Sequence, residues 1–79
     1  MTNDYSGQYL QGRSFAFHDL TGADFSGADL QGATFWKANL TNANLSGADL
    51  TEADLTSAIL WRTDMDDVKG LDTVKRLVK

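Results

Sequence analysis

Large apolar residues recur at every fifth position along most of the chain. These centres of the repeat are Tyr5, Leu10, Phe15, Leu20, Phe25, Leu30, Phe35, Leu40, Leu45, Leu50, Leu55, Leu60 and Met65. An α-helix would spread such centres around its whole circumference, and a straight strand would place successive centres on opposite faces. A chain that turns a corner once per repeat keeps every centre pointing inward. The pattern therefore predicts square coils of about twenty residues, stacked on one another.

The remaining positions of the repeat fit a square coil. From Ala23 to Ala58, alanine stands two residues before each centre, and a small polar residue such as Asp24 or Asn44 usually stands directly before it. Glycine often follows two residues after the centre, which suits a corner because turns use positive φ. The pattern predicts that the centres and alanines from Ala23 to Leu60 form a buried core.

Two stretches show the repeat most clearly: Ala-Asp-Phe-Ser-Gly-Ala-Asp-Leu-Gln-Gly over 23–32 and Ala-Asn-Leu-Ser-Gly-Ala-Asp-Leu-Thr-Glu over 43–52. They resemble the pentapeptide-repeat family, and the resemblance extends over about 3–67. It implies an all-β fold, a right-handed quadrilateral β-helix of about three coils. That family shares no catalytic or cofactor residues, so the resemblance implies a non-catalytic protein.

The first coil departs from the repeat. Its inward small positions hold Asn3, Gln8, Arg13 and His18 in place of alanine. An end coil has an unpaired edge, and polar side chains there can bond its free backbone groups. The alternative is that Arg13 and His18 form a small notch for a ligand or partner.

The period of five fails after Asp67. Val68, Leu71, Val74 and Leu77 follow at helical spacing, with basic residues at the end of the segment. We therefore expect a β-helix domain over 1–67 and a short amphipathic α-helix over 68–79 that caps the last coil. Contact of this helix with a membrane or partner is the less favoured alternative.

Composition narrows the classes of partner and location. Eleven acidic and seven basic residues give a net charge of −4, which disfavours nucleic-acid binding. The chain has no cysteine and no apolar run long enough to cross a membrane, and its N-terminus lacks a secretory pattern. We expect a cytoplasmic protein with no membrane contact.

No catalytic or metal-binding constellation is recognisable. His18 is the single histidine, so a hydrolytic triad or a zinc site is not expected. Gly22 and Gly27 have the spacing of a phosphate loop, but Ala28 and Asp29 replace the lysine and hydroxyl residue that such a loop requires. We predict no enzyme activity, no metal and no cofactor.

One surface feature breaks the preference of the repeat. Trp36 and Trp61 directly follow their centres, where Ser, Thr or Gln is usual, and each precedes a base. The predicted outward patch around one corner consists of Phe17, Trp36, Lys37, Ile59, Trp61 and Arg62. Aromatic residues and arginine are typical of protein interfaces. The alternative is that the C-terminal tail folds back over both tryptophans.

These observations predict a non-catalytic scaffold that presents a rigid surface for protein–protein interaction. The patch would bind a protein partner or a second copy of the chain. The alternative function, borrowed from family members that resemble duplex DNA, is a DNA-mimicking inhibitor of a topoisomerase or another DNA-binding protein. A short chain with a charge of −4 suits that alternative less well.

Overall fold

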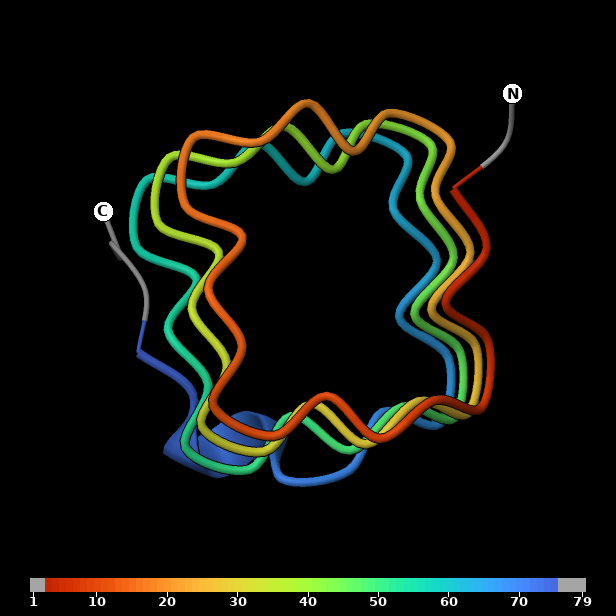
Figure 1. Ribbon diagram of the computed structural model, residues 1–79, viewed down its shortest axis with the longest axis vertical. Helices are drawn as coiled ribbons and strands as arrows, with labels where there is room; N and C mark the ends of the chain where they lie inside the picture. The colour runs from red at the N-terminus through yellow and green to blue at the C-terminus, as the bar shows by residue number, and fades with distance from the viewer. Residues whose placement is uncertain (1–2, 76–79) are drawn as a thin grey trace.

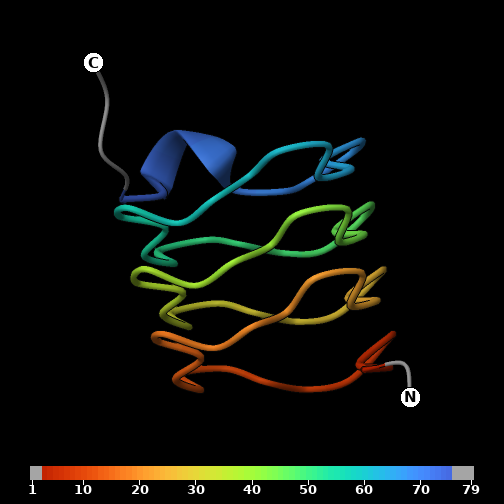
Figure 2. The same ribbon diagram turned by 90° about the horizontal axis from the view of Figure 1, so that it is seen from above.

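The computed structural model describes residues 3–75, which wind into a stack of square coils. Figure 1 shows the square outline from one end, and Figure 2 shows the coils one above another. Within residues 3–75 the regular elements are one 3-10 helix, η1 (Leu71–Thr73), and single-residue parallel β-bridges. Bridged residues are twenty apart along the chain, except Asp54 and Lys75. The twenty-residue coil expected from the sequence is therefore the observed register.

The bridges define four walls, which we number in chain order. Wall 1 carries the column Asp4–Asp24–Asn44–Asp64, wall 2 Tyr9–Asp29–Asp49–Lys69, wall 3 Ser14–Thr34–Asp54–Lys75, and wall 4 Asp19–Asn39–Ile59. Walls 2 and 4 lie on opposite sides of the square, as do walls 1 and 3.

Each corner is closed by a hydrogen bond from a residue's N–H to the carbonyl oxygen three residues earlier. At one corner, Ala23 N donates to Leu20 O at 2.9 Å, and Gly22 between them has φ 74°. Positive φ at the third residue is the requirement of a type II turn. It recurs at every fifth residue from Gly7 to Asp67, and seven of these corner residues are not glycine: Phe17, Lys37, Asn42, Glu52, Ser57, Arg62 and Asp67.

The polar residue before each centre supports the next corner. Asp24 Oδ1 accepts hydrogen bonds from the N–H and the hydroxyl of Ser26, at 2.9 and 2.7 Å. Asn39 accepts the same pair from Thr41, at 3.0 and 2.6 Å. Side-chain oxygens of this kind mimic a backbone turn. This explains why Asp or Asn precedes a centre and Ser or Thr follows it.

Hydrogen bonds of this kind also affect the ionisation of carboxyl groups, among them those of Asp4, Asp19 and Asp49. The hydroxyl groups of Ser6, Thr21 and Thr51, followed by the N–H groups of the same residues, lower the pKa of Asp4, Asp19 and Asp49, respectively, below the ordinary 3.8. The charged form accepts these bonds better than the protonated form does.

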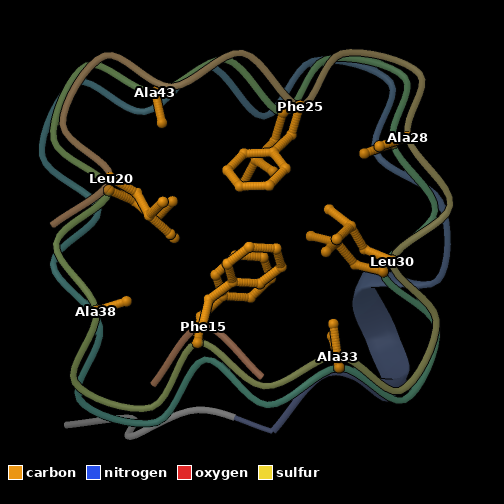
Figure 3. Packing of buried hydrophobic residues seen from close by; sticks show 14 of the residues in the cluster. Phe15, Leu20, Phe25, Ala28, Leu30, Ala33, Ala38 and Ala43 are labelled. Atoms are coloured by element: carbon orange, nitrogen blue, oxygen red, sulfur yellow. The ribbon is translucent and has the colours of Figure 1, made fainter. Parts of the chain in front are cut away.

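The core confirms most of the predicted burial. All the centres from Leu10 to Leu55 and all the alanines from Ala23 to Ala53 are buried, whereas Ala58 and Leu60 are only half-buried. Figure 3 shows Phe15 and Phe25 projecting toward each other from opposite walls. Their ring centroids are 5.4 Å apart at 81°, and Phe15 also stacks on Phe35 at 5.2 Å. Small and large side chains thus alternate around the coils from Ala23 to Leu55 and fill their interior.

The polar residues of the first coil lie over the aromatic end of this core. The Arg13 guanidinium carbon is 5.9 Å from the centroid of the Phe15 ring, and the His18 ring meets the same phenyl ring edge-on, also at 5.9 Å. Gln8 Nε2 donates to the carbonyl oxygen of Asp4 at 3.3 Å. These contacts favour the edge-covering interpretation over a ligand notch.

The α-helix expected over 68–79 is absent from 68–75, and 76–79 lie outside the described residues. Instead the ladder continues past the expected domain boundary at 67: Lys69 N donates to Ala48 O, and Lys75 N donates to Ala53 O, each at 2.9 Å. Val74 packs against the core, whereas Leu71 is exposed, and Leu77 is among the residues not described. The reason is that the coil below offers free backbone groups, and so short an isolated helix is marginal.

Gly70 allows the chain to cross the last described corner. One extra residue here shifts the register from twenty to twenty-one, and η1 takes the place of the regular turn. Gly70 has φ 74°, and a Cβ built on it would lie 2.7 Å from both Cα and N of Thr51. The backbone of the coil below therefore leaves no room for a side chain.

The substitution Gly70→Ala is expected to lower the free energy of unfolding by about 2–4 kcal/mol, because it adds a steric clash to the cost of positive φ. Gly22→Ala is the matched control, since it has the same φ of 74° but nothing within 4 Å of its Cβ. The control should lose only about 1 kcal/mol in urea unfolding. Equal losses in the two variants would contradict the close approach to Thr51.

The lowered pKa values predict acid sensitivity. Because the folded-state pKa of Asp4, Asp19 and Asp49 is lowered, their stabilising contribution is complete above the ordinary value of 3.8. It is lost as the pH falls through the folded values. The free energy of unfolding should therefore decline below about pH 4. The triple Asp→Asn variant keeps the acceptor oxygens, so its free energy of unfolding should decline less steeply as the pH falls.

Candidate functional site

The corner between walls 3 and 4 carries a compact cluster of two aromatic rings and a lysine. Phe17 N donates to Trp36 O at 2.9 Å, so the two residues lie on adjacent coils. Their ring centroids are 5.2 Å apart at 84°, an edge-to-face arrangement. Lys37 Nζ lies 5.0 Å from the centroid of the Trp36 ring and 6.0 Å from that of Phe17. Both distances are within the range of cation–π attraction.

A second aromatic and cationic pair occupies the corner that follows wall 4. Asn42 N donates to Trp61 O at 3.0 Å, which places Trp61 one coil beyond Asn42. The guanidinium carbon of Arg62 lies 4.9 Å from the centroid of the Trp61 ring. Ile59 lies on wall 4 between the two corners, paired with Asn39.

The predicted patch is therefore divided between two successive corners. The structure brings Phe17, Trp36 and Lys37 together, and it brings Trp61 and Arg62 together, but no ring contact joins the two tryptophans within residues 3–75. We call the whole set, with Ile59, the wall 4 patch. Its two groups flank one wall, so a single flat partner surface could reach both.

The large apolar side chains of the wall 4 patch face outward. Phe17 is 66% exposed, Trp61 64% and Trp36 40%, and Ile59 is also exposed. The tail as far as Lys75 runs along walls 2 and 3, where its bridges form, and leaves these side chains uncovered. Exposed aromatic groups of this size on a small protein are typical of an interaction surface.

Three residues of the wall 4 patch stand at corner positions with positive φ. Phe17 has φ 63°, Lys37 57° and Arg62 59°, where most corners of the repeat have glycine or a small polar residue. A bulky residue in this region is unusual, and for residues other than glycine the left-handed conformation costs about 1–2 kcal/mol. Strain of this kind concentrates at functional sites. These three patch residues thus lower the stability of the corners at which they stand.

One exposed aromatic residue was not identified from the sequence. Tyr9 is 75% exposed on wall 2, opposite the wall 4 patch. Its column otherwise contains Asp29, Asp49 and Lys69. Its position in the repeat could have identified it, because Tyr9 stands directly before the centre Leu10, where the repeat usually has Asp or Asn.

Pockets, metal-ligand clusters and membrane-spanning helices are absent from residues 3–75. Over 3–75 there is no pocket and no group of three His, Cys, Asp or Glu residues that could hold a metal. No helix within this part of the chain is long and apolar enough to span a bilayer.

A family model and the solved structures similar to this chain all indicate pentapeptide repeats. A family model described as pentapeptide repeats matches residues 9–36, 19–56 and 37–69. A pentapeptide repeat protein from the Arabidopsis thaliana thylakoid lumen is 41% identical with a TM-score of 0.83, covering 84% of this chain and 46% of its own. Rfr23 from the cyanobacterium Cyanothece 51142 is 32% identical with a TM-score of 0.83, covering 94% and 54%.

A more distant solved structure is HetL from Nostoc sp. PCC 7120, a pentapeptide repeat protein involved in the regulation of heterocyst differentiation. It is 29% identical with a TM-score of 0.60, covering 94% of this chain and 38% of its own. This chain thus spans about half the length, or less, of these three solved structures. A search among curated proteins found no significant match. The likeness identifies the fold as a right-handed β-helix.

The positive φ at Phe17 predicts an inverted order of stability for two substitutions. Phe17→Gly should be more stable than Phe17→Ala by about 1 kcal/mol. Both variants lose the ring, but only alanine keeps a Cβ that is strained at positive φ. Thermal unfolding of the two variants measures the difference. At the adjacent Ala16, which has no positive φ, replacement by glycine should instead lower stability. Equal stability of the two Phe17 variants would contradict the strain.

Proposed function

This chain belongs to the pentapeptide-repeat family, and on that premise we propose that it is a non-catalytic scaffold whose wall 4 patch binds a protein partner. The observation that carries the proposal is the cluster of Phe17, Trp36 and Lys37. These side chains are exposed, in mutual contact, and in part held in a strained backbone conformation.

The β-helix supplies a rigid support for such a surface. Phe17 and Trp36 are joined by a backbone hydrogen bond of 2.9 Å, and Lys37 N donates to Thr56 O on the next coil at 3.1 Å. Side chains on a fixed frame lose little backbone freedom when a partner binds. The aromatic rings have few rotatable bonds, so they also lose little side-chain entropy. These properties favour recognition of a protein surface without a separate ordering step.

The family relationship supports a binding role rather than a catalytic one. Proteins of this family are generally non-catalytic. HetL is described as involved in the regulation of differentiation, a role that a binding surface can perform. Because this chain covers less than two thirds of those relatives, its process and partner are inferred from its own surface.

The DNA-mimic alternative has weaker support. Acidic side chains do gather on walls 1 and 2, in the columns of Asp24 and Asp29. However, these carboxylates close their own turns: Asp24 bonds Ser26, and Asp29 bonds Gln31. Asn44 and Asn39 fill equivalent positions without charge. Turn closure therefore accounts for the acidic columns without reference to a DNA-binding partner.

We also propose that the interaction with the protein partner takes place in the cytoplasm. The absence of cysteine suits a reducing compartment. Self-association through the wall 4 patch is the second way in which the same surface could be covered, and it is distinguished by measuring the mass of the protein in solution.

Changing Trp36 and Trp61 to Ser should abolish partner binding and leave the fold intact. Neither tryptophan belongs to the buried core, and serine is common at this position of the repeat. The measurement is retention of proteins from the native cell extract on immobilised wild type and variant. Tyr9→Ser is the matched control, because it removes an exposed aromatic ring from the opposite wall. A retained protein that binds all three forms equally would contradict the proposal.

A further inference from the structure

We propose that the wall 4 patch recognises a carboxylate-bearing protein segment, in which Asp or Glu side chains meet Lys37 and Arg62 while an apolar side chain packs on the tryptophans. This inference rests on the proposed function, because it names the chemistry of the partner for the same surface. Four observations support it.

The corner columns separate the two signs of charge. The corner before wall 4 holds Phe17, Lys37 and Ser57, and the corner after it holds Gly22, Asn42 and Arg62. Neither column contains a carboxylate. Each of the other two corner columns contains an acidic residue. One consists of Gly7, Gly27, Gly47 and Asp67, and the other includes Gly12, Gly32 and Glu52. The patch residues thus carry two cations and no carboxylate on a protein whose net charge is −4, and the carboxylate of wall 4 itself, Asp19, lies at its first-coil end.

The two patch cations differ from the lysines of the ladder. The backbone β-bridges place Lys69 next to Asp49 and Lys75 next to Asp54 on adjacent coils, so each of these lysines has a carboxylate as neighbour. Lys37 and Arg62 instead lie against aromatic rings, at 5.0 and 4.9 Å from the centroids of Trp36 and Trp61. A ring attracts a cation without using its N–H donors. Both groups therefore keep donors free for an external anion.

The geometry of Arg62 suits a carboxylate in particular. Its guanidinium lies over the Trp61 ring, which holds the planar group in place. A planar guanidinium can donate two parallel hydrogen bonds to one carboxylate. The apolar surface of Trp61 and Ile59 beside it would exclude water from such a pair, and exclusion of water strengthens an ion pair.

The shape and charge of the patch favour a protein over nucleic acid. Two cations neutralise only two phosphates, and the phosphate contribution to affinity grows with the number of contacts. Wall 1, which carries Asp4, Asp24 and Asp64 next to the corner of Arg62, would repel a duplex. The exposed Ile59 and the two tryptophans need an apolar counterpart, which an acidic peptide with one or two apolar residues provides.

The test is selection from a random twelve-residue peptide library displayed on phage, with the wild-type chain as target. Peptides that also bind the Trp36→Ser/Trp61→Ser variant are discarded. We expect the remaining peptides to be enriched in Asp and Glu next to an aromatic or aliphatic residue. One selected peptide is then titrated by tryptophan fluorescence against wild type, Lys37→Gln/Arg62→Gln, and Lys69→Gln/Lys75→Gln as the matched control for lost charge.

The expected result is at least a tenfold weaker affinity for Lys37→Gln/Arg62→Gln, no more than a twofold change for the control, and weaker binding at high salt. Patch-dependent peptides that are neutral or basic would overturn this inference and leave the proposed function standing. Recovery of no patch-dependent peptide would count against both. Tighter binding of a 20-base-pair DNA duplex, or a concentration-dependent mass of the chain alone that the tryptophan variant loses, would also overturn it.

Discussion

A hydrogen bond across each corner of the coil, with positive φ at the third residue of the turn, sets the direction of the whole chain. In the turn from Leu20 to Ala23 this residue is Gly22. Because such a turn recurs every five residues, four of them return the chain to its starting wall, and the next coil falls in register with the last. The inter-coil hydrogen bonds and the stacked core columns both depend on that register. Asp24 and its equivalents add side-chain bonds that hold each turn closed.

The same turn gives the surface its functional potential. A corner residue points away from the core, so its side chain is free to vary, provided that the backbone cost of positive φ is accepted. Phe17, Lys37 and Arg62 carry that cost, whereas Gly22 and Gly27 do not. The neighbouring residues Trp36 and Trp61 then lie beside these side chains on the same corners. The patch is thus assembled from positions that contribute little to the core, and changes in it need not alter the fold.

Charge follows the walls for a structural reason. The outward residue before each centre must accept hydrogen bonds from the next turn, and Asp and Asn both do so. Where Asp is used, as at Asp29 and Asp49, the wall becomes acidic. Where Ile59 replaces the acceptor, the wall loses both the turn bond and the negative charge. Wall 2 has two Asp and wall 4 has Asp19 and Asn39, so the choice between Asp and Asn as acceptor sets most of the difference in charge.

Much of this molecule could be predicted from the period of five alone. The phase of the centres and alanines is sufficient to assign Phe25, Leu30 and Ala43 to the interior, because only a chain that turns once per repeat can bury them all. The same phase marks Trp36 and Trp61 as outward and unusual. These predictions are local, since each depends on the position of a residue within its own repeat.

The tertiary structure decided what depends on neighbouring coils. The helical spacing of Val68, Leu71 and Val74 predicted an α-helix, but the free backbone groups of the coil below pair with Lys69 and Lys75 instead. The division of the patch between two corners also depends on stacking, because Trp36 and Trp61 lie one coil and one wall apart. The edge-to-face contact of Phe17 with Trp36 joins residues nineteen apart in the chain. Local periodicity determines which way a side chain points, whereas the register between coils determines which side chains meet.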